Sequence, residues 1–297
     1  GAPKVFKVSE VKVLRDGKMI GNVVTKEADR DKLISMMVGR ELSSYYTRNR
    51  HEIKGVSLEV KQLGHETYFK DVSFYARYGE IVGFAGLIGA GRTELMKTIF
   101  GAFQKSAGEV FLDGKPVSIR KPQDAIDLGI VYVSEDRRGE GLILNNDVKF
   151  NMGLVCLSDF IHGIGVNQTA WDDMVESYRK KFSIKITSPH QLASNLSGGN
   201  QQKVVLSKWL AKKPKVIILD EPTRGIDVGS KAEIYGIIDE LAGQGVSIIM
   251  VSSELPEIIN MCNRCYVMCE GRLTGELEEH DFTQEAMMDF ATRREVQ

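Results

Sequence analysis

The feature that most restricts the fold is a glycine-rich turn between an apolar segment and a helix-favouring segment. Residues 81–85 are apolar, and residues 94–97 favour a helix. The turn itself reads Gly86-Leu87-Ile88-Gly89-Ala90-Gly91-Arg92-Thr93. Glycine lets backbone N–H groups curl around an anion, and the positive end of the following helix points at the same anion. The turn therefore predicts a strand, a phosphate-binding loop and a helix, although glycines also mark tight turns that bind nothing.

One position departs from the phosphate-loop pattern. The spacing G-x-x-x-x-G-K-[ST] is met at every defined position except the lysine, which is Arg92, and Thr93 is placed to ligate Mg²⁺. Lysine carries a compact point charge, whereas arginine ends in a broad planar fork. We therefore expect Arg92 to attract phosphate but to fit the narrow slot less well, which weakens transition-state stabilisation rather than affinity.

Two further motifs suit the chemistry of phosphates. Residues 216–219 are apolar and end in Asp220 and Glu221, an arrangement that places an Mg²⁺-linked aspartate beside an acid that positions water. A strand that ends in acids is also common at a solvent edge, so this pair alone decides nothing. Upstream, Ser197 and two glycines open an amphipathic helix that runs to about Lys212. Such a helix start presents hydrogen-bond donors to an anion.

Together these stretches resemble the ATP-binding cassette (ABC) ATPases. The phosphate loop (P-loop), an LSGG signature, an LDEP strand and a D-loop at residues 225–227 stand in the family's order, from about residue 57 to the end. Three longer stretches, LSGGNQQK, LDEPTRGIDVG and SEDRRGEGL at residues 134–142, are similar to the second cassette of ribose- and galactose-type sugar importers. The resemblance implies an α/β fold with a parallel-sheet core, an antiparallel β subdomain and a helical subdomain over about residues 145–210.

The resemblance also implies roles for individual residues. Two cassettes clasp two ATP molecules head to tail, each ATP between the P-loop of one cassette and the signature of the other. ATP would contact residues 86–93, Glu221 would be catalytic and Asp227 would lie in the D-loop. Mg²⁺ would be held by Thr93, Asp220 and Glu135. The signature residues that would contact the partner's ATP are Ser197, Gly198, Gly199 and Asn200.

Three positions besides Arg92 depart from the general family pattern. Glu135 replaces a glutamine that usually senses Mg²⁺ and the permease, and Ser253 replaces a histidine that usually reaches the γ-phosphate. The third departure is that no aromatic residue stands clearly where one usually stacks on adenine; Tyr68 is a weak candidate and His65 a weaker one. We therefore expect a degenerate site that binds ATP but turns it over poorly, and an isolated chain that is weak or inactive. The intact signature would complete the productive site of the preceding cassette.

The two ends of the chain resemble each other. Residues 13–21 and 267–275 both read as strand, glycine turn and strand, and a helix with apolar positions follows each copy. The offset is 254 residues, measured from Gly17 to Gly271. We interpret residues 1–47 as the tail of a preceding cassette, 48–56 as a linker and 57–297 as the second cassette. Chance similarity between two short hairpins is the alternative.

Composition excludes several classes of function. With 39 Lys and Arg against 40 Asp and Glu, the chain lacks the basic stripe that follows a nucleic-acid backbone. Its apolar runs fall short of the roughly 20 residues of a membrane-spanning helix, so a membrane role would be peripheral. Without an initiator Met or a leader, we expect a cytosolic piece of a longer protein. We interpret the cysteines as structural residues without metal or disulfides: Cys156, Cys262, Cys265 and Cys269.

The resemblance implies a function in transport. The chain would be the ATPase module that energises import of a monosaccharide through a transmembrane permease, at the cytoplasmic face of the bacterial inner membrane. Residues 136–146 would face the permease, and a sugar-binding protein would be an indirect partner. Two alternatives stay open: a soluble two-cassette ATPase without a permease, and a regulatory nucleotide-binding module without hydrolysis. The lack of basic surface and the NQQK after the signature speak against the first, and Glu221 speaks against the second.

Overall fold

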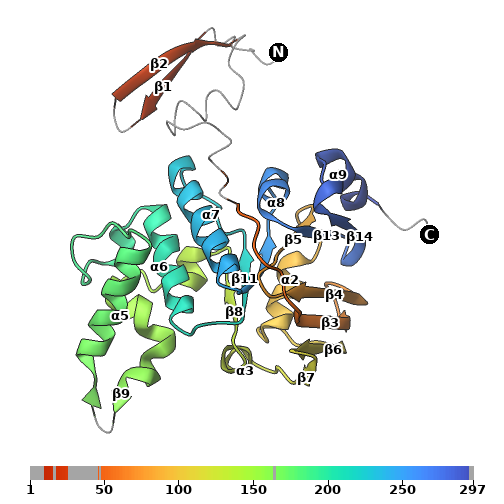
Figure 1. Cartoon of the computed structure of the whole chain (residues 1–297), viewed down its shortest axis with the longest axis horizontal. Helices are drawn as coiled ribbons and strands as arrows, with labels where there is room; N and C mark the ends of the chain where they lie inside the picture. The colour runs from red at the N-terminus through yellow and green to blue at the C-terminus, as the bar shows by residue number, and fades with distance from the viewer. Residues whose placement is uncertain (1–9, 16–17, 26–45, 47, 163–164, 294–297) are drawn as a thin grey trace, which may run out of the picture.

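The computed structural model describes residues 10–15, 18–25, 46, 48–162 and 165–293. Its central layer is a six-stranded sheet that is parallel except at one edge, where β14 runs antiparallel to β13 (Figure 1). The order across the sheet is β14 (Arg272–Glu278), β13 (Arg264–Cys269), β5 (Ile81–Gly86), β12 (Ser247–Val251), β11 (Val216–Asp220) and β8 (Ile130–Val133). The predicted parallel-sheet core is confirmed.

The central strands are apolar because both faces of the sheet are buried. Alternate side chains enter two separate cores, as the two-residue period of a strand requires. Ile217 and Leu219 enter one core, together with residues of α6 (Gly198–Leu210), α7 (Val228–Gly243), α8 (Leu255–Met261) and α9 (Gln284–Ala291). Val216 and Ile218 enter the other core, together with residues of α2 (Arg92–Ile99) and α3 (Pro122–Asp127). The sheet is thus fixed between two packed layers.

The second core also includes residues of an antiparallel sheet. Its strands are β4 (Val72–Arg77), β3 (Val56–Gly64), β6 (Ala107–Leu112) and β7 (Lys115–Val117), in that order. A mostly helical part lies between β8 and β11 in the chain. It comprises η3 (Arg137–Gly141), α4 (Val148–Gly153), η4 (Leu154–Phe160), β9 (Ile161–His162), β10 (Gly165–Val166), α5 (Gln168–Lys181), η5 (Ala193–Asn195) and α6. The predicted fold class, with its three parts, is confirmed.

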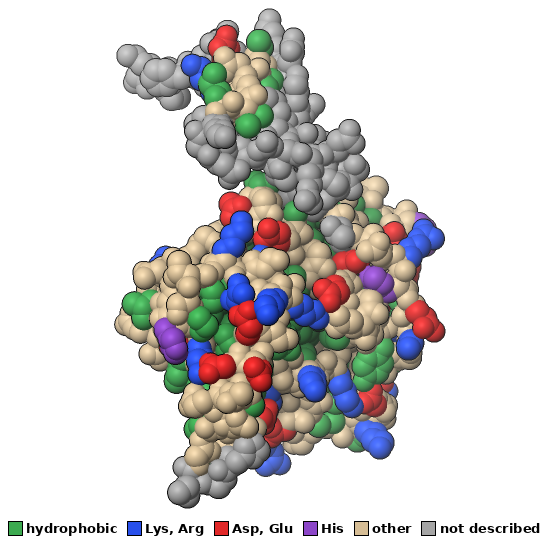
Figure 2. Space-filling view, turned by 60° about the vertical axis from the view of Figure 1, so that its left-hand side comes forward, with side chains coloured by type: hydrophobic (Ala, Val, Ile, Leu, Met, Phe, Trp, Pro, Cys, Tyr) green, Lys and Arg blue, Asp and Glu red, His purple; other side chains and the backbone are tan. Residues whose placement is uncertain are grey.

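The surface charges, the helices and the cysteines can be compared with what the sequence predicts about nucleic acid, membranes and metals. On the face drawn in Figure 2, Lys and Arg side chains are interspersed with Asp and Glu. Across the described part of the chain, the helices are too short or too polar to pass through a membrane. The four cysteines are buried and form no disulfide with one another, and the described residues hold no group of three or more His, Cys, Asp and Glu suited to a metal. Cys265 and Cys269 lie in the buried strand β13.

The hairpin of β1 (Glu10–Arg15) and β2 (Lys18–Val24) has the same register as β13 and β14. Val13 pairs with Gly21, Val267 pairs with Gly275, and the register shifts directly after both pairs. Every paired position differs by the 254 residues that separate Gly17 from Gly271 in the sequence. A shared irregularity favours a repeated module over chance similarity. Much of the segment 1–47 lies outside the described residues, so its assignment to a preceding cassette stays a prediction.

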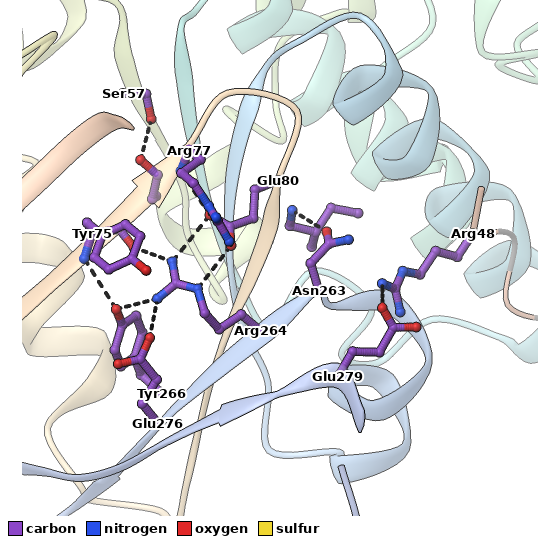
Figure 3. A network of polar contacts seen from close by, with 12 residues as sticks. Arg48, Ser57, Tyr75, Arg77, Glu80, Asn263, Arg264, Tyr266, Glu276 and Glu279 are labelled. Carbon is purple, nitrogen blue, oxygen red and sulfur yellow. Dashed lines mark hydrogen bonds and ion pairs between the residues drawn. The ribbon is translucent and has the colours of Figure 1, made fainter. Parts of the chain in front are cut away.

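The predicted linker is bound to the cassette at its start. Asn49 donates to both carboxylate oxygens of Asp239 in α7, through its backbone N at 2.7 Å and its Nδ2 at 2.6 Å. His51 Nε2 lies 2.9 Å from the same carboxylate, which is nearly buried. Arg48 forms an ion pair with Glu279 at 2.7 Å (Figure 3). We refer to residues 48–52 as the strap, since these contacts hold them against the domain.

A buried arginine joins the antiparallel sheet to the central sheet (Figure 3). Arg264 of β13 and Glu80, which directly precedes β5, both have fully buried side chains, and the Arg264 Nε to Glu80 Oε1 distance is 3.0 Å. Arg264 Nη2 also donates to the carbonyl oxygen of Tyr75 in β4 at 2.8 Å. Its Nη1 donates to Glu276 in β14 at 2.7 Å. Because the guanidinium is planar and has five donors, it can serve several strands at once.

Replacement of this arginine should destabilise the fold strongly. In Arg264→Met, Glu80 keeps a buried charge with only Arg77 beside it, so we expect a loss of about 3–5 kcal/mol in the free energy of unfolding. Addition of Glu80→Gln removes the unpaired buried charge. The double variant should therefore lose less free energy of unfolding than the sum of the losses of the two single variants. Urea unfolding followed by circular dichroism measures both losses. The exposed Arg293→Met is the control and should change little; strictly additive losses would refute the coupling.

Candidate functional site

The predicted phosphate loop forms the bend between β5 and α2. Gly91 is the N-cap of α2, and the φ angles of Gly89 and Gly91 are 81° and 90°, a left-handed backbone that suits glycine. A Cβ atom on Gly91 would also come within 2.9 Å of the Tyr68 carbonyl oxygen. All the predicted loop residues lie in this bend or the first turn of α2: Gly86, Leu87, Ile88, Gly89, Ala90, Gly91, Arg92 and Thr93.

Arg92 is held by the two loops that follow β11 and β12. Its Nη1 donates to the carbonyl oxygen of Ser252 at 2.7 Å. Its Nη2 lies 3.7 Å from a carboxylate oxygen of Glu221, and both side chains are at least nine-tenths buried. Burial lowers the pKa of Arg92, and the negative charges of Glu221 and Asp220 oppose that shift. The guanidinium therefore balances the acids of the site as well as being available to a phosphate.

Glu221, the predicted catalytic residue, directly follows the last residue of β11. Its φ of 47° is left-handed, a strained conformation for a residue with a Cβ atom, and its N–H donates to the carbonyl oxygen of Val251 at 2.9 Å. Ser253 Oγ donates to the carboxylate at 3.2 Å. Burial raises the pKa of Glu221, whereas Arg92 and then Ser253 lower it. The structure brings these three predicted residues together.

Asp220 is a fully buried carboxylate with one unpartnered oxygen. Tyr132 of the neighbouring β8 donates to Asp220 Oδ2 at 2.7 Å, while Asp220 Oδ1 has no hydrogen-bond partner among the described residues. Burial raises the pKa of Asp220, and the hydroxyls of Tyr132 and Thr93 oppose the rise. Magnesium prefers oxygen ligands, so an unpartnered carboxylate oxygen with a threonine hydroxyl nearby fits this ion.

Glu135, the third predicted Mg²⁺ residue, makes a contact of its own. Its carboxylate lies 2.7 Å from Arg224 Nη1 and is partly exposed. Its charge still reaches Asp220, whose pKa it raises. In the part of the chain that the structure describes, no three His, Cys, Asp and Glu side chains form a metal-binding group. Mg²⁺ is usually bound through one or two carboxylates together with water and phosphate oxygens of the substrate.

The signature residues form the start of α6. Ser197 is the N-cap, and Asn200 donates to its Oγ through the backbone N at 3.4 Å and through Nδ2 at 3.0 Å. Gly198 packs close to the backbone of the D-loop, and a Cβ atom on Gly199 would meet Ser230 at 2.3 Å. The signature stands at the start of α6, whereas the other end of this helix packs against the end of α2, where the ring centroids of Trp209 and Phe100 are 6.0 Å apart.

The D-loop leads from β11 to α7. Asp227 is the N-cap of α7, and its Oδ1 accepts a hydrogen bond from the backbone N of Ser230 at 3.0 Å. Ser230 also packs against Gly199 of the signature. Both predicted motifs therefore meet at one place on the surface of the chain.

The candidates for stacking on adenine form an exposed aromatic group beside the phosphate loop. The ring centroids of Tyr68 and His65 are 4.8 Å apart, and Tyr68 stacks on Phe103 at 5.9 Å. Tyr68 is 46% exposed, so its ring is accessible to a ligand. Sequence reasoning missed Phe103, because no motif marks this position; its aromatic type, shortly after α2, was the only signal.

Two buried partners of the site were also missed. Tyr132, which donates to Asp220, lies on β8, and only the pairing of β8 with β11 brings it there. Glu257 in α8 is buried and accepts hydrogen bonds from the hydroxyls of Thr223, Tyr235 and Ser252. No spacing rule points to either residue, since both contacts depend on the tertiary arrangement.

Comparisons with known proteins show the family of the chain. The ABC transporter family matches residues 69–224, which is more than half of the chain. The ribose import ATP-binding protein RbsA of Clostridium tetani is 44% identical over 290 residues, covering 97% of this chain and 57% of the relative. A putative ribose/galactose/methyl galactoside import ATP-binding protein of Halalkalibacterium halodurans is 47% identical over 283 residues, covering 95% of this chain and 54% of the relative. The chain spans about half the length of these relatives.

Solved structures share the fold. An ATP-binding cassette of an ABC transporter superposes with a TM-score of 0.69 at 20% identity, covering 80% of this chain and 99% of that one. A nucleotide-free ATP-binding cassette from an ABC transporter gives a TM-score of 0.67 at 20% identity, with 81% of this chain and all of the other covered. With its P-loop, signature and acidic strand end in the cassette arrangement, the chain belongs to the ABC transporter family as an ATP-binding cassette.

Proposed function

We propose that the chain is the second ATP-binding cassette of a two-cassette subunit that powers import of a monosaccharide through a membrane permease. Relatives named for ribose or galactose import match almost the whole chain, yet the chain spans only 54–57% of their length. The register of β1 and β2, which repeats that of β13 and β14, supports a preceding cassette of the same kind. Residues 1–47 would then be its tail, and residues 57–297 the second cassette.

The proposal makes the two ATP sites of the subunit unequal, with slow hydrolysis at the site on this cassette's own phosphate loop. The contact between Arg92 and Glu221 is the observation that supports this difference. A general base must accept a proton from water, so its carboxylate has to be available to that water. Burial raises the pKa of Glu221 and Arg92 opposes that rise, but the contact with Arg92 at 3.7 Å also engages the carboxylate. Ser253, which donates to the same carboxylate, has no imidazole to offer the phosphate. The site would therefore bind ATP and hydrolyse it slowly.

The other predicted residues of the site would bind the nucleotide and Mg²⁺. The N–H groups of the phosphate loop would cradle the phosphates, and Tyr68 with Phe103 would offer a ring face to adenine. Thr93, Asp220 and Glu135 would hold Mg²⁺, which supplies charge that offsets the phosphates. These residues place the nucleotide even where turnover is slow.

The signature would serve the other nucleotide site. Ser197 is exposed and caps α6. A helix start with accessible donors suits a phosphate brought by another cassette. The productive ATP site would therefore combine this signature with the P-loop of the preceding cassette.

The permease would contact residues 136–146, at the cytoplasmic face of the bacterial inner membrane. This segment includes the η3 turn and Ile143, an apolar side chain that is 43% exposed. A separate sugar-binding protein would deliver the substrate to the permease. The chain itself would not contact the sugar, because its site is shaped for phosphates.

ATP binding tests the nucleotide site directly. By isothermal titration calorimetry, we expect ATP to bind with a Kd in the micromolar range and about tenfold more tightly with Mg²⁺ than without it. Asp220→Asn should remove most of the Mg²⁺ effect, because it alters the unpartnered carboxylate. Asp127→Asn, at the exposed end of α3, is the control and should keep the effect. Absence of binding would reduce this cassette to a donor of its signature.

The rate of ATP hydrolysis by the two-cassette subunit tests whether one ATP site is productive and the other slow. Ser197→Arg should lower kcat at least about tenfold, because the bulky cation blocks the signature of the productive site. The exposed Ser194→Arg, three residues earlier, is the matched control and should change little. Glu221→Gln should lower kcat by less than about twofold, because its own site contributes little. Full activity of Ser197→Arg would contradict the proposal.

A further inference from the structure

We propose that Glu257 is a positioning residue that holds both loops around the γ-phosphate end of the nucleotide site and so sets the preference of this cassette for ATP over ADP. The inference rests on the proposed function, because it requires a nucleotide at the phosphate loop. Glu257 does not reach the ligand itself; it acts through the residues that do.

Glu257 lies behind the site, in the first turn of α8, and its side chain is 1% exposed. Thr223 Oγ1 and Tyr235 Oη donate to its Oε1, and Ser252 Oγ donates to its Oε2 at 2.5 Å. Lys231 Nζ lies 3.8 Å from Oε1. A carboxylate is a pure acceptor, so it can take three hydroxyl donors at once, which an amide cannot do.

Two of the three donors belong to the loops of the site. Thr223 is two residues after Glu221, whose left-handed backbone needs support from its surroundings. Ser252 directly precedes Ser253, and its carbonyl oxygen accepts the hydrogen bond from Arg92 at 2.7 Å. One buried carboxylate therefore fixes the loop after β11 to the loop after β12.

These loops face one end of the nucleotide. In a phosphate loop of this spacing, the residue at the position of Arg92 reaches the β- and γ-phosphates. Glu221 contacts Arg92, and Ser253 contacts Glu221. The groups that Glu257 positions therefore bear on the phosphate that distinguishes ATP from ADP.

A purely structural role for Glu257 gives a different expectation. The third donor, Tyr235, belongs to α7, outside the two loops. If Glu257 served only to join elements of the core, loss of the Tyr235 hydroxyl and loss of the Ser252 hydroxyl would have similar effects. If Glu257 positions the site, loss of the Ser252 hydroxyl changes nucleotide binding and loss of the Tyr235 hydroxyl does not.

The test compares the affinities of the chain for ADP and for an ATP analogue with a non-hydrolysable β–γ bridge, both with Mg²⁺, by calorimetry. In Glu257→Gln, an amide donor replaces one acceptor and opposes a hydroxyl donor. We expect the analogue to bind about tenfold more weakly and ADP to bind within about twofold of the wild type, because the loops lose their pre-organisation.

Matched variants separate positioning from stability. Glu254→Gln is the control, since Glu254 forms an ion pair with Lys231 at 2.6 Å but its side chain takes no bond from the three hydroxyls, and we expect unchanged binding of both ligands. Ser252→Ala should weaken the analogue selectively, whereas Tyr235→Phe should lower the denaturation midpoint and leave the ratio of affinities unchanged. These two variants decide the question if Glu257→Gln does not fold.

The outcomes distinguish the inference from the proposed function. Wild-type chain that binds neither ligand would overturn the proposed function. Wild-type chain that binds both, with an unchanged ratio in folded Glu257→Gln, would overturn the positioning role alone. Equal shifts of the ratio in Ser252→Ala and Tyr235→Phe would overturn it as well, because they would show a general effect of the core.

Discussion

Parallel pairing brings the carboxyl ends of β13, β5, β12, β11 and β8 to the same edge of the central sheet, and the polar groups of the site follow from that edge. β5 continues into the phosphate loop, β11 into Glu221 and β12 into Ser252. In open α/β sheets, ligands bind outside this end of the strands. Since the two faces of the sheet fill two different cores, a slip of one residue would move each side chain into the other core, and this fixes the register of each strand and the position of each group at its end. The site is therefore as rigid as the packing beneath it.

Local spacing was enough to predict much of this arrangement. The β5 strand, its glycine turn and α2 are adjacent in sequence, as are β11 and its two acids, so pattern and geometry agree. The contact of Arg92 with Ser252 could not be predicted, because 160 residues separate them and only the pairing of β5 with β12 brings them together. Glu257 was missed for the same reason: its three donors come from different elements. The contacts of the predicted linker with Asp239 were also hidden, because a polar stretch looks alike whether it is free or bound.

Arginine at the lysine position changes the chemistry through its shape and its constant charge. Its fork reaches a backbone carbonyl and a carboxylate at once, and burial strengthens both interactions. A nucleotide phosphate would compete with these two partners for the donors of Arg92. The strained backbone at Glu221 is likewise held by the surrounding hydrogen bonds, in a conformation that the isolated chain would avoid.

The strap has a consequence for whatever module lies upstream of it. A flexible tether lets its two ends explore a volume that grows with the length of the tether. Hydrogen bonds to Asp239 and an ion pair with Glu279 hold residues 48–52 against the domain, so these residues add nothing to the flexible length of the tether. The flexible part of the tether therefore ends before Arg48. A shorter tether raises the effective concentration of one module at the surface of the other. If the proposed preceding cassette is present, the contacts of the strap would shorten the flexible connection to it, and this would favour encounters within one polypeptide over encounters between separate molecules.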